Sequence, residues 1–207
     1  MPLELRALIA PATTAVVTSE LQNGVVGDSS VLPELAAAAR GTIANTARLC
    51  IAARAAGATV IHCTAATRAD RRGSNSNARL FNAVRKSGVQ LLPGTPAVEV
   101  VPELGPVEGD LVLNRLHGLD PMAGTDLDPV LRNLGVTTLV VTGVSVNIAI
   151  TNLVMDAVNR GYQAVLPRDA VNGVPAEYAD AVIDNTLSLL ATVTTTDDVI
   201  AAWKVRG

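Results

Sequence analysis

The sequence has few aromatic residues, little net charge and few cysteines. Phe, Trp and Tyr make up 2% of the 207 residues, so Ala, Val and Leu must fill any core. The net charge of −3 gives no electrostatic reason to expect a nucleic acid or an anionic membrane as a partner. Two cysteines, Cys50 and Cys63, are too few to indicate a disulfide framework.

Long apolar runs are also missing. No stretch reaches the roughly 18 residues of a membrane-spanning helix, and the first residues lack a basic segment followed by an apolar one. Hydrophobic residues nevertheless make up 49% of the chain and charged residues only 17%, which favours a sizeable core over disorder. We therefore expect a cytoplasmic protein that forms a single domain over residues 1–207.

Short β-branched runs alternate with Ala-rich helical patterns along the chain. The runs predict strands at 13–21, 58–65, 110–115, 137–144 and 162–170. The helical patterns predict helices at 32–57, 78–88, 126–135, 147–161 and 175–192, the first closed by Gly57 and the third with Pro129 in its first turn. Residues 193–203 predict a short last strand and a closing turn.

This alternation predicts an α/β protein, a three-layer α/β/α sandwich around a parallel, Rossmann-like sheet of about six strands. The strands read as continuous apolar runs, so helices should cover both faces. Sites in such sheets lie at the carboxyl ends of the strands. That edge should bring together Glu20, the segment 62–64, Arg115 and the segment 145–149.

Three segments resemble the isochorismatase-like hydrolase superfamily, also called the cysteine hydrolases. "VVTSELQNG" resembles an apolar strand followed by D-x-Q-N, and "GTPAVEVVPEL" resembles the family's G-T-x-x-x-E-x-x-P-E-L segment. "LVVTGVSVNIAITNLVMDAVNRGYQAVLPRDA" resembles the long motif of strand, nucleophile turn, helix and next strand. Together these motifs are specific, and the resemblance covers nearly the whole chain.

In the cysteine-using members, an Asp, a Lys and a Cys form a catalytic triad. The resemblance assigns these positions to Glu20, Arg115 and Ala149 in this sequence, so all three depart from the pattern. Ala149 has no attacking atom, which excludes thioester chemistry there. True isochorismatases also lack the cysteine and are thought to use the first-strand carboxyl as an acid.

Two functions follow from this changed triad. One is a cysteine-independent hydrolase of a small, anionic molecule, with Glu20 as acid or water-orienting base and Arg115 as an anion clamp. The other is a catalytically inactive relative that binds a small ligand or serves in assembly. In either case the alternative role of Glu20 and Arg115 is to form an ion pair with each other and to take no part in catalysis. The resemblance also implies a homo-oligomer, either a dimer or a tetramer.

Other residues at the same edge are candidates for substrate binding, namely Ser145, Asn147, His117 and Thr64. Asn147 could instead cap the following helix. The turn around Ser145 should present backbone N–H groups to the site, and the family often has a cis peptide there, at Val144–Ser145 in this chain.

Three other features have competing interpretations. Cys63 is either a relocated nucleophile or a packed core thiol; His62 beside it should point to the opposite face of the strand. The Arg-rich segment 66–77 is either a solvated loop, a subunit contact or a clamp for an anion. Two distant histidines predict no metal site, and "GVSVN" is not a dinucleotide motif, so we expect no cofactor.

Overall fold

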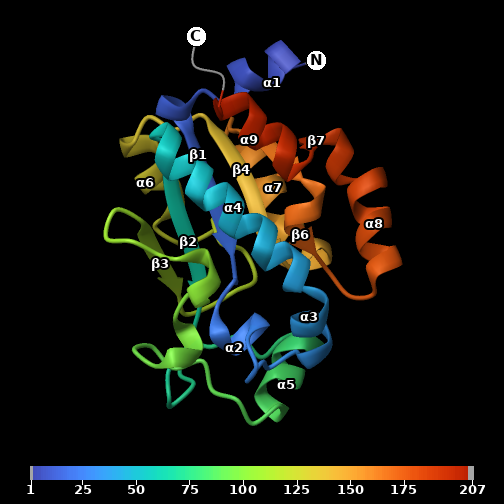
Figure 1. Cartoon of the computed structure of the whole chain (residues 1–207). Helices are drawn as coiled ribbons and strands as arrows, with labels where there is room; N and C mark the ends of the chain where they lie inside the picture. Colours follow the sequence, from blue (N-terminus) through green and yellow to red (C-terminus); the bar gives the residue numbers. More distant parts are fainter. Residues whose placement is uncertain (1, 205–207) are drawn as a thin grey trace.

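A seven-stranded sheet with only parallel pairings forms the centre of the computed structural model, which describes residues 2–204 (Figure 1). The strand order is β3-β2-β1-β4-β5-β7, and the two-residue β6 pairs with the end of β4. The strands are β1 (Thr14–Ser19), β2 (Thr59–Ala65), β3 (Leu111–Arg115), β4 (Thr138–Val144), β5 (Gln163–Pro167), β6 (Val171–Asn172) and β7 (Thr192–Thr194).

Helices cover both faces of this sheet, as the apolar strands predict. On one face Val16, Val60 and Val140 pack under α4 (Arg40–Ala56) and α9 (Thr196–Lys204). The other face packs against α6 (Leu127–Asn133), α7 (Thr151–Asn159) and α8 (Ala176–Asn185). The predicted three-layer α/β/α sandwich is confirmed.

The strand register brings the carboxyl ends of four strands to the same level. Ser19 pairs with Cys63 on one side and with Gly143 on the other, and Ala65 pairs with Arg115. At this end of the sheet lie α2 (Asn23–Val26), α3 (Pro33–Ala38) and α5 (Arg79–Lys86), on the side of the molecule opposite the labelled chain ends (Figure 1). Residues that follow β1, β3 and β4 therefore meet beneath these three helices.

Several predicted boundaries are wrong. Residues 32–57 form two helices, α3 and α4, separated at Ala39, although Gly57 does end the second one in a left-handed conformation. The predicted closing turn is the helix α9. The Thr195 hydroxyl accepts the N–H of Asp198 and donates to the Asp198 carboxylate, an N-cap contact at the start of this helix.

The sequence also missed elements and overextended others. A helix α1 (Pro2–Leu8) precedes the first strand, and the predicted fifth strand stops at Pro167. The predicted helix from 175 ends at Asn185. Among the described residues, no helix has both the length and the apolar character needed to cross a bilayer.

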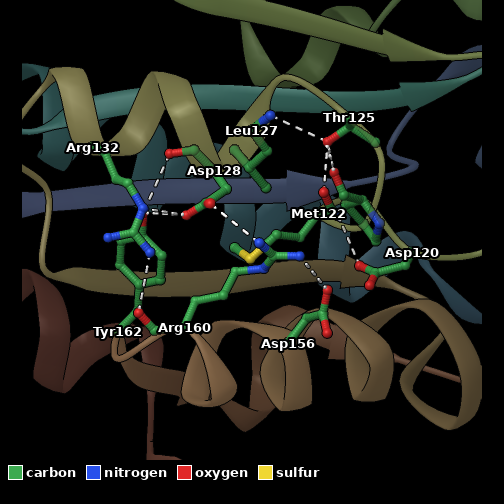
Figure 2. Close-up of polar contacts among 10 residues, drawn as sticks. Asp120, Met122, Thr125, Leu127, Asp128, Arg132, Asp156, Arg160 and Tyr162 are labelled. Atoms are coloured by element: carbon green, nitrogen blue, oxygen red, sulfur yellow. Dashed lines mark hydrogen bonds and ion pairs between the residues drawn. The ribbon is translucent and has the colours of Figure 1, made fainter.

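A network of polar side chains connects α6 to α7 on the face of the sheet that these two helices cover, and Figure 2 shows its members. Asp128 at the start of α6 accepts the Tyr162 hydroxyl at 2.8 Å and pairs with Arg132 at 3.0 Å. Arg160 pairs with Asp128 and with Asp156 on α7. The network therefore holds together α6, which follows β3, and α7, which follows the turn after β4.

His62 lies in a second polar network, beneath α4. Its ring is fully buried, with Nδ1 3.0 Å from the Thr18 hydroxyl and Nε2 3.3 Å from an Asp110 carboxylate oxygen. Arg54 on α4 binds the same carboxylate through two N–H groups. As predicted, His62 and Cys63 point to opposite faces of β2, because Cys63 packs in the cluster on the other side.

Burial lowers the pKa of His62 below its ordinary 6.5, although the hydrogen bond to Asp110 opposes the shift. Above pH 6.5 the imidazole ring of His62 is mostly neutral in both the folded and the unfolded chain. Below it only the unfolded chain takes up the proton, so acidification should lower the free energy of unfolding by at most about 1.4 kcal/mol per pH unit. His62→Gln should remove this slope in urea unfolding measured between pH 7.5 and pH 5.5.

The matched control is His117→Gln, because His117 is exposed in a loop. This variant should keep the wild-type dependence on pH. An unchanged slope in His62→Gln would show that His62 is not the group responsible.

Candidate active site

Five of the residues predicted to share the sheet edge border one cleft made of two chambers that share part of their walls: Glu20, Arg115, Ser145, Asn147 and Ala149. The predicted segment 62–64 borders neither chamber. The larger chamber, about 480 Å³, is bordered by Glu20, Ser145, Asn147 and Ala149. The smaller, about 130 Å³, is bordered by Glu20, Arg115 and other residues of the loops around it. Glu20 borders both chambers and therefore stands at their junction.

The backbone of Glu20 turns its side chain away from the strand. Glu20 directly follows β1 and has φ +55°, a left-handed conformation that is uncommon for residues other than glycine. Its N–H still donates to the Cys63 carbonyl at 2.8 Å, so its position relative to β2 is fixed. Backbone conformations of this kind occur often at functional sites.

Arg115 is the last residue of β3 and forms an ion pair with Glu20 through Nη2. The Arg115 side chain is only 4% exposed and that of Glu20 is 18% exposed. The paired Glu and Arg thus keep one negative and one positive charge in contact at the positions assigned to the family's Asp and Lys.

Two nitrogens of the Arg115 guanidinium remain without an acceptor. Nε and Nη1 are both buried and have no hydrogen-bond partner in the part of the chain that the structure describes. Ser74 also has a buried hydroxyl without such a partner, and it borders the same small chamber. Buried donors are almost always satisfied in folded proteins, so these atoms mark a place for a ligand or water.

The turn after β4 has the form that the family resemblance predicts. A cis peptide joins Val144 and Ser145, and the first helical turn after it, Val146–Ile150, is a π turn. The Ser145 carbonyl accepts the N–H groups of Ile148 and Ile150, both at 3.1 Å. Whether backbone N–H groups of this turn serve as an anion site stays a prediction.

Asn147 does not cap the helix with its side chain. Its Oδ1 atom instead accepts the Ser145 hydroxyl at 2.5 Å. Because the two side chains are joined, they form one polar group on the wall of the larger chamber, next to Ala149.

The other two candidates for substrate binding lie farther from this wall. His117 borders the smaller chamber. Thr64 does not border either chamber. Its hydroxyl accepts the N–H of the Asn114 side-chain amide at 2.9 Å. It lines a separate cavity of about 330 Å³, which Arg115 also borders.

Neither cysteine borders the two chambers. Cys50 and Cys63 are both buried. Burial raises the pKa of each thiol to about 12, so little reactive thiolate forms at neutral pH. Cys63 therefore has the environment of a packed core thiol.

Sequence reasoning missed several residues that wall the cleft. Val31, Leu32 and Leu35 come from the segment around α3, and Leu80 comes from α5. Arg71 from the Arg-rich loop borders the smaller chamber, whereas Arg68 pairs with Asp70 and Arg72 is exposed. Over residues 2–204 no three His, Cys, Asp or Glu side chains gather as they would around a metal ion.

The geometry of this edge and the parallel sheet agree with comparisons to known proteins. The model of the protein family described as "Isochorismatase domain" matches residues 14–198 of this chain. This chain belongs to the isochorismatase family. The predicted resemblance is thereby confirmed at the level of the family.

The isochorismatase-family relatives include named hydrolases. The ureidoacrylate amidohydrolase RutB of Rhizobium rhizogenes is 30% identical over 209 residues, covering 93% of this chain and 84% of that protein. The crystal structure of a cysteine hydrolase from Pseudomonas syringae pv. phaseolicola is 26% identical, with a TM-score of 0.82 and 95% of each chain covered. The crystal structure of an isochorismatase family protein from Desulfovibrio vulgaris is 29% identical, with a TM-score of 0.78. The match covers 91% of this chain and 98% of that chain.

Proposed function

We propose that this protein hydrolyses a small anionic molecule without a cysteine nucleophile. The observation that carries this proposal is the Glu20–Arg115 ion pair at the junction of the two chambers. The family membership and the amidohydrolase named among its relatives support hydrolysis as the reaction class.

In this mechanism Glu20 acts as a base. Its side chain borders both chambers, where it can take a proton from a water molecule next to the substrate. The water oxygen then bonds to the electrophilic carbon of the substrate, and the leaving group departs with the proton held by Glu20. Arg115 holds the anionic group of the substrate with the N–H groups that Glu20 leaves free.

A second candidate function is binding without catalysis. Two observations favour it: Ala149 offers no attacking atom beside the chamber, and Arg115 already neutralises Glu20. Under this hypothesis the cleft retains a ligand and the family's chemistry is lost.

Turnover separates these functions. A panel of vinyl ethers, simple amides and ureido acids should include at least one substrate that the wild type hydrolyses, and Glu20→Gln should lower kcat by roughly 100-fold or more because it removes the base. The matched control is Glu108→Gln, an exposed carboxylate that borders neither chamber, which should keep kcat.

Alkylation completes this test. Iodoacetamide should leave turnover of the native protein intact, whereas the denatured chain should be labelled at both cysteines. Substrate-protected labelling of Cys63 with loss of turnover would overturn the cysteine-independent mechanism. Failure to hydrolyse any member of the panel would favour the second candidate.

A further inference from the structure

The two chambers of the cleft share a wall, and both are lined mainly by apolar side chains, but only the smaller one has cationic side chains on its walls. Val31, Leu32, Leu80 and Leu119 border both, and Glu20 stands between them. A molecule occupying the whole cleft would therefore place one end in each chamber and its middle beside Glu20.

The smaller chamber is suited to a single negative charge. Arg71 and Arg115 border it with one positive charge each, and Glu20 contributes one negative charge, so these groups leave one positive charge in excess. The buried N–H groups of Arg115 and the Ser74 hydroxyl lack partners in the described chain and can donate to an oxyanion. A volume of about 130 Å³ holds only a small group, because each water occupies about 30 Å³ in the liquid.

Arg71 is held in position by its loop. It has φ +57°, its N–H donates to the Arg68 carbonyl at 2.9 Å, and its own carbonyl accepts the Ser74 N–H at 3.1 Å. Arg71 and Ser74, which this turn joins, both border the chamber that Arg115 borders.

The larger chamber is mainly apolar. Its walls include Leu32, Leu35, Ile148 and Val174, and its polar side chains are Glu20, the joined Ser145–Asn147 pair and the exposed Glu34 at the rim. Side chains of this kind bind hydrocarbon groups by removing apolar surface from water.

We propose that the cleft recognises a monocarboxylate with a compact hydrocarbon body, and that Arg71 and Ser74 are specificity-determining residues for the carboxylate. The carboxylate occupies the smaller chamber and the hydrocarbon body occupies the larger one. This inference rests on the proposed function only in using the same cleft, since binding does not require that the ligand be hydrolysed.

Binding of cyclohexanecarboxylate, measured by isothermal titration calorimetry, tests the inference. Its affinity for the wild type should exceed those of acetate, cyclohexanecarboxamide and inorganic phosphate by roughly tenfold or more. Acetate lacks the hydrocarbon body, the carboxamide lacks the negative charge, and phosphate lacks the hydrocarbon body and carries more than one negative charge. Arg71→Gln should weaken cyclohexanecarboxylate roughly tenfold and leave the carboxamide unchanged. Ser74→Ala should weaken the carboxylate by a smaller factor.

The matched control is Arg72→Gln, which removes the same charge from the neighbouring, exposed position outside the chamber. It should leave the affinity for the carboxylate unchanged. The inference is overturned by equal binding of the carboxylate and the carboxamide, by equal losses in the two arginine variants, or by no saturable binding of the carboxylate at millimolar concentration. Binding as expected without turnover of any substrate would overturn the proposed hydrolysis and leave this inference standing.

Discussion

Glu20→Gln is expected to lower the free energy of unfolding by about 3–5 kcal/mol, because it leaves the Arg115 guanidinium buried without its counter-charge. The Arg115 side chain is 4% exposed, and its guanidinium already has two nitrogens without partners in the described chain. Removal of its only carboxylate partner there thus exposes the full cost of burying a charge. At about 2–4 °C per kcal/mol, the melting temperature should fall by about 6–20 °C.

The double variant Glu20→Gln/Arg115→Met is the control for this prediction. It removes both charges and should recover much of the lost stability, because an uncharged side chain of similar length replaces the unpaired guanidinium. A single variant as stable as the wild type would show that water solvates Arg115 well enough to make the pair unimportant for folding. The melting measurement is independent of whether Glu20 is also a catalytic base.

Gly143→Ala is expected to destabilise the protein by about 2–5 kcal/mol. Gly143 has φ +109° and pairs with Ser19 in the adjacent strand. A Cβ atom there would lie 2.2 Å from the Ser19 carbonyl oxygen and 2.8 Å from the Ser19 nitrogen, both backbone atoms at the centre of the sheet. The clash and the unfavourable φ can be relieved only by moving β1 away from β4.

Gly41→Ala provides the control, since Gly41 lies near the start of α4 and a Cβ there meets nothing within 4 Å. This change should be neutral or should stabilise the helix by about 0.5–1 kcal/mol. Urea unfolding of both variants measures the difference. Equal stabilities would mean that the close approach of Gly143 to Ser19 relaxes without cost.

The candidate site could be predicted only in part from the sequence. Glu20, Arg115 and Ala149 were assigned from motif positions, and the strand register explains why the ends that carry them meet. Arg71 was visible only as one of several arginines in a polar loop. Its position beside the smaller chamber depends on how that loop packs against residues distant in the sequence, which no local pattern records.

The helix boundaries show the same division. The end of α4 at Gly57 was predicted because a glycine after a helical pattern is a local signal. The N-cap contact between Thr195 and Asp198 is also local, and its neglect made the predicted closing turn wrong. The cis peptide before Ser145 was predicted from the family resemblance alone and has no signature in the composition of the turn.

By itself the sequence determined the order of strands and helices and hence the α/β sandwich, because apolar periodicity is a property of consecutive residues. It also determined which side chains follow the carboxyl ends of the strands. Only the tertiary structure decided that Arg115 is buried against Glu20 with free N–H groups, that His62 pairs with Asp110, and that Arg71 and Arg115 border the same small chamber. Burial and cavities arise from side chains that are distant in sequence, so their geometry is set by packing of the whole fold.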